Sequence, residues 1–478
     1  MLVEEDGRAW TYAAIEALSA RLAARLAALG VGPGERLLAQ TDKSVEALVL
    51  YFACLRAGAI YLPLNVDYTE TELAYFVADA QPVLAVCREQ SVSLFERIGQ
   101  GTLVVTTLDR LYADLGDAQL PPVPRRADDV AAILYTSGTT GKPKGAMLTH
   151  GNLASNGDAL IALWRFTPAD RLIHALPIFH VHGLFVAVHC VVFSGASMVF
   201  LGKFESGAAV KQMATATVLM GVPTFYTRLL SDPGFTRDAA AGMRLFIAGS
   251  APLSADTHRA FEERSGHRVL ERYGMTETGM LTSNPYEGER RAGSVGLPLP
   301  GVALRVAEFE TARELPQGEV GIVEVKGPNV FAGYWRNPEK TASEFRADGY
   351  FITGDMGLIE PDGYVRLVGR EKDLIITGGL NVYPAEVEAV LDDRDDVAEA
   401  AVIGLPHPDL GEAVVAVLQS TTPDFDRRVV RADLRRQLAG FKVPKEIFVI
   451  DALPRNTMGK IQKKLLREQF AQFFFEES

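Results

Sequence analysis

Hydrophobic residues near the start of the chain recur at steps of three and four positions, and a glycine follows the last of them. They are Ile15, Leu18, Leu22, Leu26 and Leu29, followed by Gly30. This spacing predicts an amphipathic helix that packs one face on a core and ends at the glycine. The apolar stretch 44–57 before Gly58 predicts a second helix, and residues 59–62 before Pro63 predict a strand.

Short apolar runs alternate with helical patterns along the middle of the chain. They cover residues 130–135, 172–176, 197–201, 217–220 and 244–248. Such alternation is typical of parallel sheets covered by helices. We therefore expect the α/β fold class, with a large N-terminal domain of parallel or mixed sheets layered with helices.

A change of pattern near residue 370 predicts a domain boundary. Charged residues cluster in the segment GREKD at 369–373, between two apolar runs. Beyond it the pattern predicts a small α+β unit, with helices near 385–391 and 429–439 and strands near 398–404 and 412–419. We expect one domain over 1–369 and a second over 370–478, with a hinge near Lys372.

Composition narrows the class of protein. The chain has 478 residues, 48% of them hydrophobic, which suits an enzyme with two or more domains. Its net charge of −12 argues against a general nucleic-acid binder, so local basic groups must attract any anionic substrate.

Targeting signals and cysteine usage favour a cytoplasmic protein without a membrane span. The acids Glu4, Glu5 and Asp6 argue against a signal peptide, and no uncharged apolar stretch reaches the roughly 20 residues of a membrane helix. The cysteines are far apart and show no metal-binding spacing, as expected in a reducing compartment. They are Cys54, Cys87 and Cys190.

The segment YTSGTTGKPKG at 135–145 carries the first candidate chemistry. It lies between two apolar runs, which predicts a strand, a polar loop and a second strand. Glycines let backbone N–H groups close around an anion, while hydroxyls and two lysines, Lys142 and Lys144, add donors and positive charge. These groups suit a triphosphate, although the GxxxxGK[ST] pattern of a Walker loop is absent. Taken alone, the segment could equally be a polar surface loop.

Seven segments in order along the chain resemble the motifs of the adenylate-forming superfamily, which contains acyl-CoA ligases, luciferases and peptide-synthetase adenylation domains. They are YTSGTTGKPKG (135–145), LPIFHVHGL (176–184), AGSAPL (248–253), RYGMTET (272–278), YFITGD (350–355), GREKDLIITGGLNVYPAEVE (369–388) and PRNTMGKIQ (454–462). The resemblance implies that an acid reacts with ATP to give an acyl-adenylate, and that the acyl group then passes to a thiol. It also implies that the small C-terminal domain is mobile and rotates between these two half-reactions.

The resemblance assigns nucleotide-binding roles to three groups of residues. The phosphates are expected to contact Thr136, Ser137, Gly138, Thr139, Thr140, Gly141 and Lys144. The adenine slot is expected to consist of Gly249, Ser250, Ala251, Pro252, Tyr273 and Gly274. Asp355 and Arg370 are expected to bind the ribose, because a carboxylate can accept hydrogen bonds from both ribose hydroxyls.

Further roles follow from the same resemblance. Lys460 corresponds to the catalytic lysine that bridges the acid carboxylate and the α-phosphate, and its surroundings resemble a site that protein acetyltransferases modify. Glu277 corresponds to the Mg²⁺-linked glutamate, with Thr276 beside it at the phosphates. His180 corresponds to an aromatic gate next to the acyl pocket. Gly378 and Gly379 are expected to line a narrow tunnel for the pantetheine arm of coenzyme A.

Polar residues in the acyl-site segments indicate an acid with a second charge. His182 follows His180 by two positions, so both point to one side of an extended segment. Arg228, Arg290 or Arg291 could pair with a second carboxylate near Ser250. Each could instead be a surface or salt-bridging residue, and we expect this of at least one of Arg290 and Arg291.

These segments most resemble malonyl-CoA synthetases, which implies malonate, with methylmalonate tolerated, as the acid. The alternatives are a CoA ligase for another short carboxylic acid and a freestanding adenylation enzyme that loads a carrier protein. A luciferase-like oxygenase also remains open. A non-enzymatic nucleotide-binding module is the weakest alternative, because it would leave Lys460, Glu277 and Asp355 without a purpose.

Overall fold

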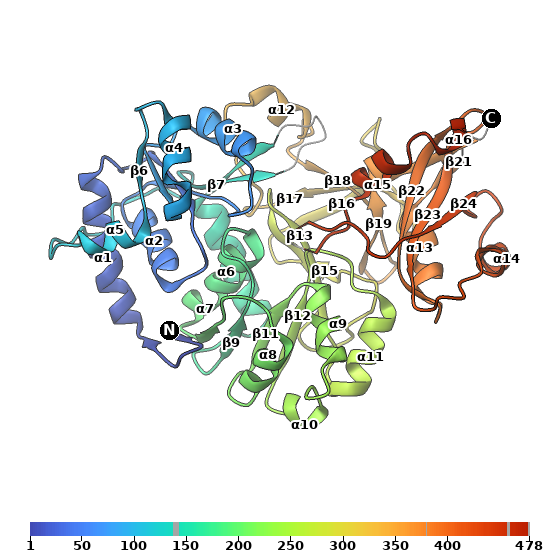
Figure 1. Ribbon diagram of the computed structural model, residues 1–478, viewed down its shortest axis with the longest axis horizontal. Coiled ribbons are helices and arrows are strands. Elements are labelled where there is room, and N and C mark those ends of the chain that lie inside the picture. Colours follow the sequence, from blue (N-terminus) through green and yellow to red (C-terminus); the bar gives the residue numbers. More distant parts are fainter. Residues whose placement is uncertain (137–142, 379, 457–458, 477–478) are drawn as a thin grey trace.

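The computed structural model describes residues 1–136, 143–378, 380–456 and 459–476, and these form a large N-terminal part and a smaller C-terminal part (Figure 1). The C-terminal strands and helices, orange to red in Figure 1, lie to one side of the rest of the molecule. This mixed α/β architecture confirms the fold class expected from the sequence.

The first sheet of the large part contains six strands among the described residues. In spatial order they are β6 (Val104–Thr106), β5 (Leu84–Cys87), β3 (Arg36–Gln40), β4 (Ile60–Pro63), β7 (Val130–Thr136) and β8 (Lys144–Thr149). All neighbours pair in parallel except β7 and β8, which are antiparallel. The predicted strand–loop–strand pattern around the glycine-rich segment is thereby confirmed for its two strands, while residues 137–142 of the loop lie outside the described residues.

The second sheet has nine strands in the described chain. In spatial order they are β15 (Leu297–Pro298), β14 (Gly279–Ser283), β13 (Leu270–Met275), β12 (Leu245–Ala248), β11 (Val218–Gly221), β9 (Arg171–His174), β10 (Ser197–Phe200), β1 (Leu2–Glu4) and β2 (Ala9–Trp10). Strands β9 to β13 and β1 pair in parallel, as the apolar runs predict. Their carboxyl ends lie on one edge of the sheet, where ligands of open α/β sheets bind.

The described residues contain two further, smaller sheets, one antiparallel and one mixed. One consists of β16 (Ala303–Ala307), β17 (Gly321–Lys326), β18 (Phe351–Ile359) and β19 (Val365–Arg370). The other consists of β21 (Leu380–Val382), β20 (Ile375–Thr377), β23 (Gly411–Ser420) and β22 (Val397–His407), with β24 (Glu446–Val449) beside β23. The chain passes from the first of these sheets to the second across the short 3₁₀ turn η3 (Glu371–Asp373).

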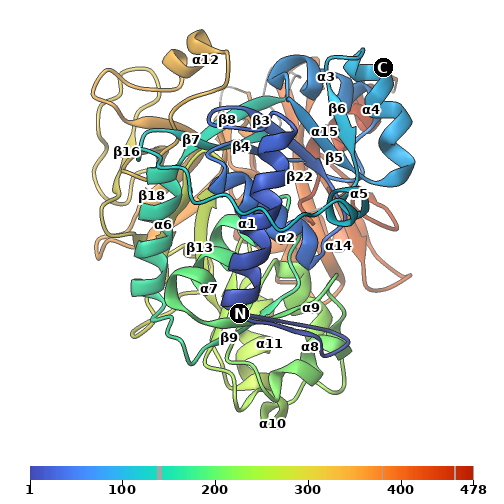
Figure 2. The same cartoon turned by 90° about the vertical axis from the view of Figure 1, so that its left-hand side faces the viewer.

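Helices cover the sheets of the large part. They are α1 (Tyr12–Ala28), α2 (Val45–Arg56), α3 (Glu70–Ala80), α4 (Val92–Gly99), α5 (Leu108–Ala113), α6 (His150–Leu163), α7 (His189–Ser194), α8 (Ser206–Met213), α9 (Pro223–Ser231), α10 (Arg237–Ala240), α11 (Ala255–Ser265) and α12 (Pro338–Ser343). Short helical turns occur at η1 (Glu89–Ser91) and η2 (His182–Val188), the latter a π-helix. The first helix, expected from its apolar spacing, runs across the face shown in Figure 2 beside α2, and the Thr11 hydroxyl caps it.

The small part has apolar cores of its own on the two faces of its sheet. Helices α13 (Pro384–Asp392) and α14 (Arg427–Gln437) contribute Leu391 and Leu434 to one face. Helix α15 (Lys463–Phe470) contributes Leu466 to the other, followed by α16 (Phe473–Glu476). Both helices and both strands predicted here from the sequence are confirmed. The boundary between 369 and 370 itself stays a prediction.

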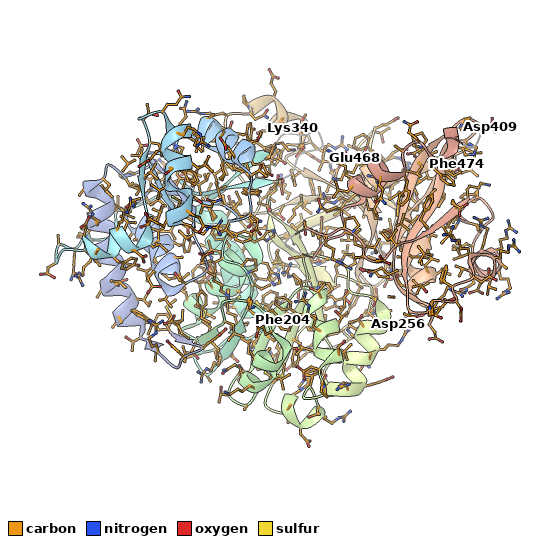
Figure 3. The ribbon with its side chains drawn as sticks, viewed as in Figure 1. Phe204, Asp256, Lys340, Asp409, Glu468 and Phe474 are labelled. Atoms are coloured by element: carbon orange, nitrogen blue, oxygen red, sulfur yellow. The ribbon has the colours of Figure 1, made fainter. Side chains whose placement is uncertain are left out.

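Polar contacts join the two parts. Arg259 on α11 lies 3.2 Å from the carboxylate of Asp393, near the labelled Asp256 in Figure 3. Next to the junction, Arg467 on α15 pairs with Asp373. The exposed pair of Arg259 with Asp393, which alone of the two joins the parts, contributes only about 0–1 kcal/mol. The contacts therefore suit a domain that can turn relative to its neighbour.

We expect Lys372→Pro to separate the two half-reactions that the resemblance implies. Proline fixes φ near −65° and would hinder rotation about this residue. Acyl-adenylate formation, measured by ATP–pyrophosphate exchange, should largely survive, while thioester formation should collapse. Lys372→Ala, which keeps φ free, should retain both. Parallel loss of both activities in the proline variant would place the pivot elsewhere.

Candidate active site

A tight hairpin turn at the carboxyl end of β13 presents Glu277. Residues Thr276, Glu277 and Thr278 form the turn to β14, and the Glu277 side chain is buried. Its Oε1 atom accepts a hydrogen bond from the Thr136 hydroxyl at 3.2 Å and lies 3.2 Å from the Tyr334 oxygen. Burial raises the pKa of the Glu277 carboxyl above its usual value.

The predicted ribose pair lies together in the fold. Asp355 on β18 faces Arg370 on β19 across the ladder, and Arg370 Nε lies 2.8 Å from Asp355 Oδ1. The Tyr273 hydroxyl donates to Asp355 Oδ2 at 2.5 Å. This buried carboxylate therefore connects the predicted adenine aromatic with the predicted ribose arginine.

The backbone around the predicted adenine slot is unusual. Ser250 has φ = 73°, a left-handed conformation that is uncommon for a residue with a side chain and that occurs at functional sites. Gly274 lies at an irregularity in the β13–β14 ladder, where a Cβ atom would come within 2.1 Å of the Gly279 carbonyl oxygen. Only glycine fits this close approach.

Among the residues predicted to bind the phosphates, Lys144 is the one whose surroundings are described most fully. Its Nζ lies 3.0 Å from Glu344 Oε1 and 4.3 Å from the centre of the Tyr334 ring. The predicted phosphate contacts Ser137, Gly138, Thr139, Thr140 and Gly141 lie outside the described residues, and Thr136 is the end residue of β7.

His182 is the first residue of the π-helix η2, and His180 lies in the turn before it, so the extended segment expected here from the sequence is wrong. His182 Nδ1 is 3.2 Å from the Ser250 hydroxyl, while its buried Nε2 has no hydrogen-bond partner among the described residues. Burial lowers the pKa of His182 well below its usual value, and burial with nearby Lys460 and Arg272 lowers that of His180 to about 3. Both imidazoles are therefore neutral at physiological pH.

Arg272, at the centre of β13, was not singled out from the sequence. Its side chain is only 4% exposed, and its Nε and Nη2 atoms make no hydrogen bond with any described residue. It lies against Gly249, where a Cβ atom would be 2.5 Å from the guanidinium carbon. Burial lowers the pKa of Arg272 to about 10, which leaves it charged at neutral pH. A buried charge without a partner is costly, so the Arg272 guanidinium indicates a place where an anion binds.

Two of the three arginines considered from the sequence already have partners in the fold. Arg291 pairs with Glu289, Glu360 and Asp362 and stacks on Tyr364, so its guanidinium is occupied at the surface. Arg290 donates to three backbone carbonyls. Because nearby partners already satisfy both guanidinium groups, neither is free to pair with a second carboxylate in this structure.

Arg228 is exposed on α9, since helical periodicity turns Phe225 and Leu229 inward. It follows Thr224 by one turn, and Thr224 lies 3.4 Å from the position of a Cβ on Gly459. Arg228 is therefore near the contact between the large and the small part, and its contact with the acid stays a prediction that competes with Arg272.

The loop before α15 brings Lys460 to the contact between the two parts. Asn456 fixes its backbone, accepting from the Lys460 N–H at 3.0 Å. The Lys460 side chain remains exposed to solvent, while protein surrounds its ammonium group. Desolvation, followed by the nearby positive charge of Arg370, lowers the pKa of Lys460 to about 8. The structure thus brings Lys460 together with Glu277, Asp355, Arg370 and Arg272.

The remaining predicted residues lie at the junction and in the small part. Lys372 is in η3, and burial lowers its pKa. Gly378 has φ = 57° at the turn between β20 and β21, a hairpin that exposes Ile376 and Leu380. Gly379 lies outside the described residues, so a pantetheine tunnel lined by these glycines stays a prediction.

The donor set around Glu277 suits Mg²⁺ held mainly by substrate phosphates. The described residues contain no group of three or more His, Cys, Asp or Glu side chains that could hold a metal by themselves. Mg²⁺ commonly binds one or two carboxylates together with phosphate oxygens. Glu277, with the Thr136 hydroxyl beside it, fits that arrangement.

Two known protein families match different parts of the chain. The family described as AMP-binding enzyme matches residues 1–335, and the AMP-binding enzyme C-terminal domain matches residues 386–460. A feruloyl-CoA synthase from Amycolatopsis sp is 36% identical over 98% of this chain and 95% of its own length. A malonate–CoA ligase from Arabidopsis thaliana is 34% identical over 91% of this chain and 78% of its own length.

Solved structures resemble the whole chain. The crystal structure of ATP-bound MatB from Rhodopseudomonas palustris is 53% identical, with a TM-score of 0.97 over 99% of this chain and 96% of that one. Within the described ranges, no helix is both long and apolar enough to cross a membrane.

The lowered pKa of Lys460 predicts a pH dependence. Because the pKa lies below the ordinary lysine value of 10.5, the ammonium is present below about pH 8 and is lost as the pH rises through that value. The kcat/KM for ATP in pyrophosphate exchange should fall above about pH 8. In Lys460→Arg, whose guanidinium stays charged, this alkaline decline should disappear even if the rate is low. A wild-type profile that stays flat to pH 10 would contradict the assignment.

Proposed function

Because this chain belongs to the AMP-binding enzyme family, we propose that it joins malonate to coenzyme A through a malonyl-adenylate. The comparisons support the coarser activity, an AMP-forming acid–CoA ligase. The choice of malonate, with methylmalonate also accepted, rests on the acid pocket.

The unpaired guanidinium of Arg272 is the observation that carries the choice of acid. It is buried beside the predicted acid site, and its Nε and Nη2 atoms point to no partner within the described residues. A carboxylate can accept two parallel hydrogen bonds from these atoms, which satisfies both charge and geometry. Neutral His182 and the Ser250 hydroxyl add hydrogen-bonding groups on the same side.

Both carboxylates of malonate then have a place. The distal one pairs with Arg272, and the proximal one faces the α-phosphate of ATP. Its oxygen attacks phosphorus, an O–P bond forms, and pyrophosphate leaves with the bonding electrons. Lys460 is placed to reduce the repulsion between the two negative groups, as preorganised charge does in catalysis.

Other residues hold the nucleotide during this step. Asp355 accepts from the ribose hydroxyls with Arg370 beside it, and the positively charged Lys144 faces the phosphates. Mg²⁺ held at Glu277 would supply positive charge to the polyphosphate. In the second half-reaction the CoA sulfur bonds to the acyl carbon, the thiol loses its proton, and AMP leaves.

Two rival substrates make different demands on the pocket. Ferulate would bring an aromatic ring against the Arg272 guanidinium and leave the charge without an anion. A short acid with a sulfonate as its second anion would satisfy Arg272 as malonate does. A freestanding enzyme that loads a carrier protein would make the same adenylate but would not use CoA.

Malonate should be preferred to butyrate, which lacks the second charge. Leaving a buried charge unpaired costs on the order of 2–5 kcal/mol, so we expect at least about a hundredfold difference in kcat/KM. AMP release measured with ATP, CoA and each acid gives this ratio. Release of ADP and phosphate instead would exclude the chemistry, and AMP release without CoA consumption would favour the carrier-loading alternative.

The arginine responsible can be identified by paired substitutions. Arg272→Met should abolish most of the preference for malonate over butyrate, while Arg228→Ala should retain it. The reverse result would assign the distal carboxylate to Arg228. Equal rates for the two acids in the wild-type protein would rule out dicarboxylate selectivity altogether.

Lys460→Ala should slow only the first half-reaction. One preorganised charged group contributes about 10²–10³-fold to a rate, so adenylation should fall by this factor or more. Given synthetic malonyl-adenylate and CoA, the variant should form malonyl-CoA at nearly the normal rate. Equal loss of both steps would make Lys460 structural, and unchanged adenylation would remove it from catalysis. Acetylation of Lys460, which removes its charge, is proposed to imitate the alanine variant.

A further inference from the structure

Glu344 connects residues from three separate segments of the large domain. It directly follows α12, and its side chain is largely buried. Its Oε1 atom lies 3.0 Å from Lys144 Nζ, and its Oε2 atom accepts from the Tyr334 hydroxyl at 2.6 Å. None of the sequence motifs includes Glu344.

The backbone fixes the carboxylate in place. The Glu344 N–H donates to the Thr341 carbonyl, and its own carbonyl accepts from the Ile352 N–H at 2.8 Å. Tyr334 is held as well, because its N–H donates to the Thr341 hydroxyl at 2.9 Å. The Glu344 backbone and its partner Tyr334 are therefore both held by contacts that do not involve Lys144.

Lys144 depends on this carboxylate in turn. A lysine side chain has four rotatable bonds and loses much conformational freedom when it is held in one geometry. Its ammonium lies over the Tyr334 ring and against Glu344, and these two contacts fix its direction. The Tyr334 oxygen also lies 3.2 Å from Glu277 Oε1, which brings the ammonium near the predicted Mg²⁺ ligand.

A second lysine balances the charge. Lys340 Nζ lies 2.7 Å from the same Glu344 Oε1 atom that contacts Lys144 (Lys340 is labelled in Figure 3). When Lys144 contacts a phosphate, Lys340 still pairs with the carboxylate. Glu344 can therefore orient Lys144 without remaining as an uncompensated negative charge beside the triphosphate.

We propose that Glu344 is a positioning residue, which directs the Lys144 ammonium toward the triphosphate of ATP during adenylation. This inference rests on the proposed acid–CoA ligase function but not on the choice of acid. It assigns Glu344 to the first half-reaction only, because the second has no triphosphate.

The test compares Glu344→Gln with Glu339→Gln, a matched change at an exposed residue on α12. Glutamine keeps the shape and can still accept from Tyr334, but it removes the charge that holds Lys144. Loss of one charge-assisted contact is expected to weaken ATP binding by roughly tenfold and to slow pyrophosphate exchange by roughly ten- to a hundredfold. Glu339→Gln should match the wild-type protein.

Three readouts separate positioning from a general structural role. Thioester formation from preformed acyl-adenylate and CoA should stay within about twofold of wild type in Glu344→Gln. The double variant Lys144→Ala/Glu344→Gln should be no slower in adenylation than Lys144→Ala alone, because Glu344 acts through Lys144. ATP affinity, measured by calorimetry on the intact protein, reports on Glu344 even if malonate is not the substrate.

Several results would overturn the proposal. Equal loss of both half-reactions would make Glu344 structural, and additive effects in the double variant would separate it from Lys144. Tighter ATP binding in Glu344→Gln would show that the carboxylate competes with the triphosphate. Absence of AMP formation by the wild-type protein with malonate would contradict the proposed substrate alone and leave the affinity comparison valid.

Discussion

The burial of Arg272 without a carboxylate partner constrains the site more than any other feature. A guanidinium that is only 4% exposed requires a counter-anion, and none of the described side chains provides one. Gly249 allows this arrangement, because any side chain there would meet the guanidinium. The ligand must therefore supply the negative charge that pairs with Arg272. This requirement is the basis on which we propose a small dicarboxylate as the acid.

Other cationic side chains gather around the same site. The chain carries a net charge of −12, yet the site brings cationic side chains together from distant segments. Arg272 comes from β13, Arg370 from β19, Lys144 from β8 and Lys460 from the loop before α15. These groups are placed where a carboxylate must approach a polyphosphate, so local charge opposes the global field. Lys460 belongs to the small part of the molecule, so movement of that part can change which half-reaction the cations serve.

The sequence predicted the regular elements well, because their signals are local. The spacing of Ile15, Leu22 and Leu29 sets one helix face, and the apolar runs of the second sheet mark fully buried parallel strands. The motifs also brought Asp355 and Arg370 to one place, since these residues pair across adjacent strands.

Side-chain partners were less predictable. Arg291 and Arg272 look equally available in the sequence, and only the fold places Glu360 and Asp362 against the first and leaves the second unpaired. The available signal for Arg272 was its place as the arginine that opens the RYGMTET motif. Glu344 and Tyr334 gave none, because their contacts with Lys144 and Glu277 join residues that are distant in the chain.

A crystal structure with a non-reactive malonyl-adenylate analogue would test the central claim most directly. We expect the distal carboxylate to accept hydrogen bonds from Nε and Nη2 of Arg272 at about 2.7–2.9 Å, the range of charge-assisted bonds. A distal carboxylate bound by Arg228 or by solvent, with the Arg272 guanidinium still unpaired, would contradict it.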